Sequence, residues 1–98
     1  MLSKAEIVLK VNYAKGELSS YGVSKIGIFG SAVRGQMRED SDIDILIDFE
    51  NDKENFLNFI ASCEILENAF AGYRVDVVTF KGLSPFIGKH IEKEVEYV

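Results

Sequence analysis

The stretch FGSAVRGQMREDSDIDILIDF, residues 29–49, decides both the fold and the candidate site. Its second half, DIDILIDF at residues 42–49, places an isoleucine at every second position. Successive side chains of a strand point to opposite faces, so the isoleucines share one face while Asp42 and Asp44 share the other. We predict a strand whose isoleucines enter the core and whose first two aspartates face one site.

Two carboxylates on one side of a strand need compensation. At a rise of about 3.3 Å per residue, the Cα atoms of Asp42 and Asp44 lie roughly 6.6 Å apart. Such carboxylates repel each other and are costly to desolvate, unless a cation or solvent compensates them. Oxygen-only ligands suit a hard cation, magnesium before zinc. Asp76, in a predicted strand at residues 73–80, could complete the set and bridge two ions about 3.5–4 Å apart, as in phosphoryl displacement.

The Gly30–Ser31 pair precedes the aspartates and has a matching chemistry. Glycine lets the backbone approach a phosphate closely, and the N–H groups and hydroxyl at a helix start are phosphate donors. Asp-x-Asp alone is common on solvated strand faces, and Gly-Ser alone marks any tight turn. Because each pattern here lies in the local structure that the chemistry requires, we favour a magnesium-nucleotide site over coincidence.

The rest of the chain supplies alternating helices and strands. Ser3 and Glu6 form a capping box before a first helix, whose apolar positions Ala5, Val8, Leu9 and Ala14 fit one face imperfectly. The predicted elements are a helix at 4–21, a strand at 25–29, at most two helical turns at 32–38, a strand at 42–49, a helix capped by Asn51 or Asp52 and ending at Gly72, a strand at 73–80, and a helix at 84–98 capped by Ser84. The helix before Gly72 should bury Phe56, Phe59, Ile60, Cys63, Leu66 and Phe70. The order α-β-α-β-α-β-α predicts an α+β domain with a small sheet.

Composition limits the function classes. We expect one domain at residues 1–98, with 47% hydrophobic residues as in globular proteins. The net charge of −5 and the pI of about 4.8 argue against a long nucleic acid as partner, because such domains usually present a basic face. The beginning MLSKAEIVLK lacks the pattern of a secretory signal, and apolar runs are short, so we expect a cytoplasmic protein without a membrane segment.

The motifs GSAVRGQMREDSDID (residues 30–44) and RVDVV (residues 74–78) resemble those of the minimal nucleotidyltransferases, in the polymerase-beta-like superfamily. The resemblance covers essentially the whole chain. It implies that Gly30 and Ser31 bind nucleotide phosphates, that Asp42 and Asp44 hold magnesium, and that Asp76 is the third carboxylate. It also implies a mixed or antiparallel sheet flanked by helices.

The resemblance further implies a reaction and a partner. Stand-alone members are typically encoded with a HEPN-domain toxin and act as its antitoxin by transferring AMP from ATP to a tyrosine of that partner, so we expect a possible hetero-oligomer. Two alternatives stay open: an antitoxin of little or no activity that neutralises its partner by complex formation, and a small-molecule nucleotidyltransferase that needs a second subunit.

Five further side chains have both a functional and a plainer interpretation. Arg34 and Arg38 could reach phosphate oxygens. We interpret Arg38 as an exposed loop residue. Arg34 is included among the nucleotide-binding candidates, and an exposed residue without such a role is an equally open interpretation. Asp48, near the strand end, and His90, in a polar helix, are expected to be solvated. Tyr97 could contact a nucleotide or a partner, but we expect it on a solvated face.

Overall fold

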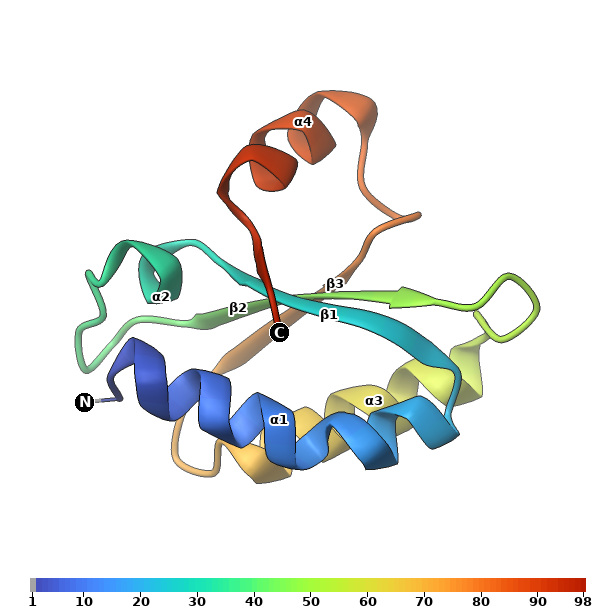
Figure 1. Cartoon of the computed structure of the whole chain (residues 1–98), viewed down its shortest axis with the longest axis horizontal. Coiled ribbons are helices and arrows are strands. Elements are labelled where there is room, and N and C mark those ends of the chain that lie inside the picture. Colours follow the sequence, from blue (N-terminus) through green and yellow to red (C-terminus); the bar gives the residue numbers. More distant parts are fainter. Residues whose placement is uncertain (1) are drawn as a thin grey trace.

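The structure is a computed structural model and describes residues 2–98 (Figure 1). Its elements are α1 (Lys4–Ser20), β1 (Val23–Phe29), α2 (Ser31–Arg34), β2 (Ile43–Phe49), α3 (Phe56–Ala69), β3 (Val75–Thr79), α4 (Pro85–Glu94) and β4 (Glu96–Tyr97). The predicted order is confirmed up to α4, and a short fourth strand follows it. None of the helices in the described part of the chain is long and apolar enough to span a membrane.

The four strands form one mixed sheet in the order β3-β2-β1-β4. β1 is antiparallel to both β2 and β4, whereas β2 and β3 are parallel. The parallel pair requires a crossover, and α3 supplies it. Figure 1 shows α1 and α3 side by side along one face of the sheet and α4 on the opposite side. The predicted mixed sheet flanked by helices is confirmed.

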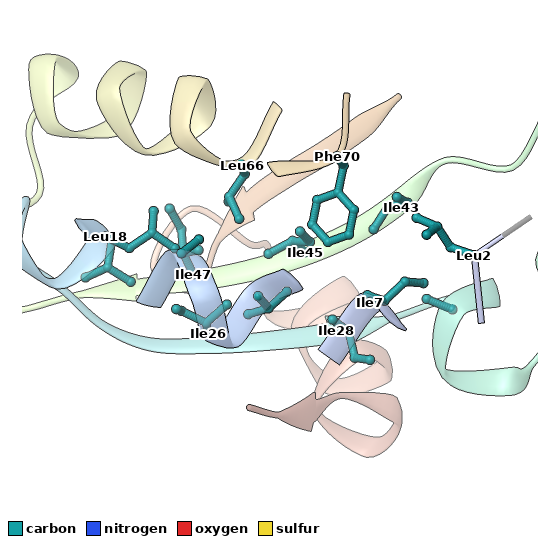
Figure 2. Packing of buried hydrophobic residues seen from close by; sticks show 14 of the residues in the cluster. Leu2, Ile7, Leu18, Ile26, Ile28, Ile43, Ile45, Ile47, Leu66 and Phe70 are labelled. Carbon is teal, nitrogen blue, oxygen red and sulfur yellow. The ribbon is translucent and has the colours of Figure 1, made fainter. Parts of the chain in front are cut away.

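The core lies between the sheet and the helices α1 and α3. Ile43, Ile45 and Ile47 are fully buried there, as the alternation of β2 predicts (Figure 2). They meet Leu66 of α3 and Phe70 just after it. Burying an isoleucine side chain stabilises a fold by about 1.5–3 kcal/mol, so these three side chains fix which face of β2 turns inward. The aspartates of β2 are thereby directed to the other face.

Helix α1 has the predicted capping box but buries a different face. The Ser3 Oγ accepts a hydrogen bond from the Glu6 N–H, and the Glu6 carboxylate accepts one from the Ser3 N–H, both at 3.1 Å. The second bond lowers the pKa of the Glu6 carboxyl. The helix buries Ile7, Val11, Ala14 and Leu18, which recur at helical spacing. The expected face is therefore wrong for Ala5 and Leu9, which are exposed, whereas Ala14 is buried and Val8 packs partly buried against the core.

Helix α3 begins later than predicted. Residues 50–53 make a turn, in which the Lys53 N–H donates to the Glu50 carbonyl at 2.9 Å, so neither Asn51 nor Asp52 caps the helix. Asn55 is the cap, and its Oδ1 accepts from the Asn58 N–H at 2.9 Å.

The buried face of α3 is also narrower than expected. Phe56 lies in the exposed first turn with 75% of its surface accessible, and Ile60 is 38% exposed. Cys63 is partly buried, and burial raises the pKa of its thiol. Leu66 and Phe70 are fully buried as predicted. The helix is thus anchored to the core mainly by Leu66 and Phe70, and Phe59 packs partly buried against the same core.

The C-terminal helix begins as predicted but ends early. The Ser84 Oγ accepts from the Ile87 N–H at 3.2 Å, and Pro85 occupies the first turn. The helix stops at Glu94, and residues 96–97 pair with β1 as β4. Gly27 of β1 makes this pairing possible, because a Cβ there would lie 2.5 Å from the Val95 Cγ2. The prediction of a helix to the chain end was wrong.

Candidate active site

The turn between β1 and α2 is pressed against a carboxylate of β2. Gly30 has a φ of 71°, and its carbonyl accepts hydrogen bonds of 3.2 Å from the N–H groups of Val33 and Arg34. A Cβ at Gly30 would lie 2.2 Å from the Asp44 Oδ2. Both the conformation and the contact exclude a side chain at this position. The predicted phosphate-binding turn and the predicted carboxylate are therefore direct neighbours.

The three predicted aspartates lie at the same end of the sheet. Asp44 and Asp76 are directly paired residues of the parallel strands β2 and β3, so their side chains share the face opposite the isoleucines. Adjacent strands lie about 4.8 Å apart. Asp42 immediately precedes β2, and its charge acts on Asp44. Asp44 is half-buried, whereas Asp76 is exposed on the edge strand.

Crowding of negative charge perturbs Asp44. Burial, and after it the charges of Asp76, Asp42 and Glu94 in that order, together raise the pKa of the Asp44 carboxyl to about 6. The Arg34 guanidinium acts in the opposite direction. Ionisation of Asp44 is therefore less favourable in the folded chain than in an unfolded one, and a cation placed among these carboxylates would favour the ionised form.

Two ion pairs surround the carboxylates. The Arg74 Nε lies 3.0 Å from the Asp42 Oδ1. Arg34 pairs through its Nη1 with the Glu94 Oε1, and its Nε donates to the Gln36 Oε1 at 3.1 Å. Each arginine thus binds one carboxylate of the site.

Sequence reasoning missed Arg74 and Glu94. Arg74 had a signal, because the parallel pairing of Ile43 with Val75 sets the segment Arg-Val-Asp beside Asp-Ile-Asp. Opposite charges then face each other at the first position and like charges at the third. No sequence signal could have identified Glu94, since its approach to Arg34 depends on the path of α4 across the open side of the sheet.

The carboxylate oxygens are suitable ligands for a hard divalent cation, but the side chains are not arranged around a common metal position in this structure. Within residues 2–98, no three acidic, histidine or cysteine side chains are placed so that they could hold one metal ion together. Asp42 is instead paired with Arg74, so a metal ion that uses Asp42 competes with this arginine. The donors are nonetheless all oxygens, and the repulsion at Asp44 is what a divalent cation offsets. The residues fit magnesium on this chemistry.

The remaining candidates are placed as follows. Ser31 begins α2, and its Oγ lies 3.4 Å from the Met37 Sδ. Arg38 is an exposed loop residue whose N–H donates to Ser41. Asp48, near the far end of β2, pairs with Lys81 at 3.2 Å.

His90 and Tyr97 lie at the surface. His90 is exposed and packs edge-to-face against Phe86, with ring centroids 5.8 Å apart. The Lys25 Nζ lies 6.0 Å from the centre of the Tyr97 ring, and Tyr97 is 52% exposed. The plainer interpretations of Arg38 and His90 agree with these positions, whereas the Asp48 side chain is only 23% exposed and is held in its ion pair with Lys81 rather than solvated.

Comparison with known proteins places these residues in a family context. The model of the nucleotidyltransferase domain family matches residues 11–98. A protein of Thermococcus cleftensis named protein adenylyltransferase MntA is 46% identical over 99 residues, which cover 100% of this chain and 98% of that protein.

Solved structures share the fold. One described as a minimal nucleotidyltransferase superposes with a TM-score of 0.84 at 28% identity, covering 97% of this chain and 95% of the other. A second, described as a toxin–antitoxin with AMP-PNP, has a TM-score of 0.67 at 20% identity over 98% of this chain and 72% of the other, which is a likeness of fold. These matches include both motif segments quoted for the resemblance.

Proposed function

This chain belongs to the nucleotidyltransferase domain family, and we propose that it transfers AMP from ATP to a hydroxyl group of a partner toxin, for which it serves as antitoxin. One observation is the main support for a catalytic role. The Gly30 backbone is packed on Asp44, and Asp44 is paired in register with Asp76, so a phosphate-binding turn and two carboxylates share one surface.

The proposed reaction is a displacement at the α-phosphate of ATP. The acceptor oxygen attacks this phosphorus, a new P–O bond forms, the bond to the β-phosphate oxygen breaks, and pyrophosphate leaves. Gly30 and Ser31 bind the leaving phosphates, and Arg34 binds their oxygens. Asp76, exposed and beside Asp44, accepts the proton of the attacking hydroxyl or helps to hold a metal ion.

Magnesium is the proposed cofactor, and Asp42, Asp44 and Asp76 would hold it. When bound, it neutralises phosphate charge and polarises the phosphoryl group. The contribution of the chain is to keep these carboxylates on one surface. The buried isoleucines of β2 do this by fixing the orientation of the strand.

The proposed acceptor is a tyrosine of a HEPN-type toxin. The relative at 46% identity is named a protein adenylyltransferase, which supports a protein as acceptor. The net charge of −5 favours association with a basic partner, and such a partner would supply its own hydroxyl to the site.

Incubation with the partner, ATP and magnesium tests the proposal. Intact-mass spectrometry should show one or a few AMP units on the partner, peptide mapping should assign them to tyrosine, and the toxic activity of the partner should fall. Asp44→Asn is the matched inactive control. A partner that is unmodified yet silenced equally by wild type, Asp42→Asn and Asp44→Asn would indicate neutralisation by binding. An unmodified and active partner would reject both, leaving the small-molecule alternative.

A further inference from the structure

Arg34 is engaged by a carboxylate from a distant part of the chain. It is the last residue of α2, four positions after Gly30, whereas its ion-pair partner Glu94 is the last residue of α4. The Glu94 side chain is 27% exposed and that of Arg34 is 51% exposed. The pair therefore lies at the rim of the site, where an incoming ligand can reach the guanidinium.

This pair is a principal attachment of the last turn of α4. The helix buries one residue, Ile91, while Phe86 and Ile87 on its first turn are 78% and 52% exposed. Among the described residues 2–98, Arg34–Glu94 is the only ion pair that α4 makes. Losing it would leave Ile91 and the following β4 to hold the end of the helix.

Arg34 is a positive charge among several carboxylates, so different anionic groups can compete to bind it. Asp42, Asp44 and Asp76 already crowd one surface, and Glu94 adds a fourth carboxylate whose charge acts on Asp44. A guanidinium binds carboxylate and phosphate oxygens with the same planar geometry. A triphosphate at the Gly30 turn therefore competes with Glu94 for Arg34.

We propose that Glu94 is a competitor at the nucleotide site: it occupies the Arg34 guanidinium that phosphate oxygens will bind, and the triphosphate displaces it. This inference rests on the proposed function only in placing a nucleoside triphosphate at the Gly30 turn. On this proposal Glu94 lowers the affinity of the chain for the nucleotide, and it joins α4 to the site. Release of Glu94 would loosen the end of α4 when ATP binds.

Calorimetric titration of ATP with magnesium tests the competition. Glu94→Gln keeps the shape but removes the charge, so we expect ATP to bind three- to tenfold more tightly, a gain of about 0.7–1.4 kcal/mol. Glu92→Gln is the matched control, because Glu92 is an exposed acid of the same helix that forms no ion pair with Arg34. It should leave the affinity within twofold.

A double-mutant cycle separates the hold on Arg34 from simple repulsion. In an Arg34→Ala background, Glu94→Gln should gain twofold or less. An equal gain in both backgrounds would mean that Glu94 merely repels the ligand, and a loss or no change in the wild-type background would also overturn the proposal. Should Glu94→Gln unfold in a thermal melt, Glu94→Asp keeps the charge with a shorter reach and should give a smaller gain by the same cycle.

Hydrogen exchange supplies a readout that affinity alone does not. Amides of residues 91–95 should exchange faster in the wild type when ATP and magnesium are added, and in Glu94→Gln they should be fast with or without ATP. ATP that slows these amides in the wild type would contradict displacement. If Glu94→Gln binds ATP more tightly but no transfer to a protein occurs, only the proposed acceptor is rejected. If transfer occurs but the ATP affinity of Glu94→Gln equals that of the wild type, only this inference is rejected. If no variant binds ATP, both are rejected.

Discussion

Replacing Asp44 by asparagine should stabilise the fold at neutral pH. The substitution keeps the size of the side chain and removes its charge, which is disfavoured first by burial and then by the charges of Asp76, Asp42 and Glu94. The pKa of Asp44 is raised from 3.8 to about 6. A difference of about 2 units corresponds to about 3 kcal/mol for a fully buried group. Because Asp44 is only half-buried, solvent screening reduces this to about 1–2 kcal/mol.

The sign of the pH dependence follows from the raised pKa. Protonated Asp44 is favoured in the folded chain, so its contribution is fully present below pH 3.8 and is lost as the pH rises through about 6. Asparagine does not titrate. The melting temperature of Asp44→Asn should therefore match that of the wild type near pH 4 and exceed it above pH 7 by about 5–10 °C for a domain of this size.

Thermal denaturation followed by circular dichroism, with chelator present, measures this difference between pH 4 and pH 8. Asp48→Asn is the matched control on the same strand, because it removes a carboxylate that is paired with Lys81. Its loss should cost about 0.2–1 kcal/mol at neutral pH rather than stabilise. If Asp44→Asn is no more stable than the wild type at pH 8, or if it gains equally at pH 4 and pH 8, the raised pKa of Asp44 is refuted.

Three further predictions concern the same surface. Gly30→Ala should lower the free energy of unfolding by about 1–3 kcal/mol, because φ is 71° and the new Cβ meets Asp44, and urea denaturation measures this. ATP affinity by calorimetry should drop strongly when chelator replaces magnesium; equal affinities would remove the metal from the account. Asp76→Asn should slow single-turnover transfer at saturating ATP while ATP affinity changes little, whereas Asp42→Asn should weaken both; full activity of Asp76→Asn would remove Asp76 from the site.

Local patterns predicted most of the fold because they record which face each element buries. The alternation of β2 is enough to send its isoleucines inward and its aspartates outward, since a shift by one residue would reverse every side chain. The capping residues Ser3 and Ser84 were predictable because each bonds to an N–H three residues away. By contrast, Asn51 and Asp52 have suitable side chains but lie in a turn that precedes the helix.

Features that depend on distant segments were not predictable. The strand β4 forms because Gly27 leaves room for Val95, a contact between residues far apart in the sequence. Likewise, Asp76 was identified as a candidate, but its pairing with Asp44 rather than another residue follows from the register of two parallel strands. The engagement of Arg34 by Glu94 depends on the return of α4, which no local pattern encodes.

The most direct test of the central claim follows the fate of the α-phosphate. ATP labelled at the α-phosphorus and, separately, at the γ-phosphorus would be incubated with the chain, magnesium and its toxin partner, and label on the partner measured in a single turnover. We predict label from the α position only, with Asp44→Asn at least a hundredfold slower, which is a barrier increase of about 2.7 kcal/mol. Label from the γ position, or undiminished transfer by Asp44→Asn, would contradict nucleotidyl transfer at this site.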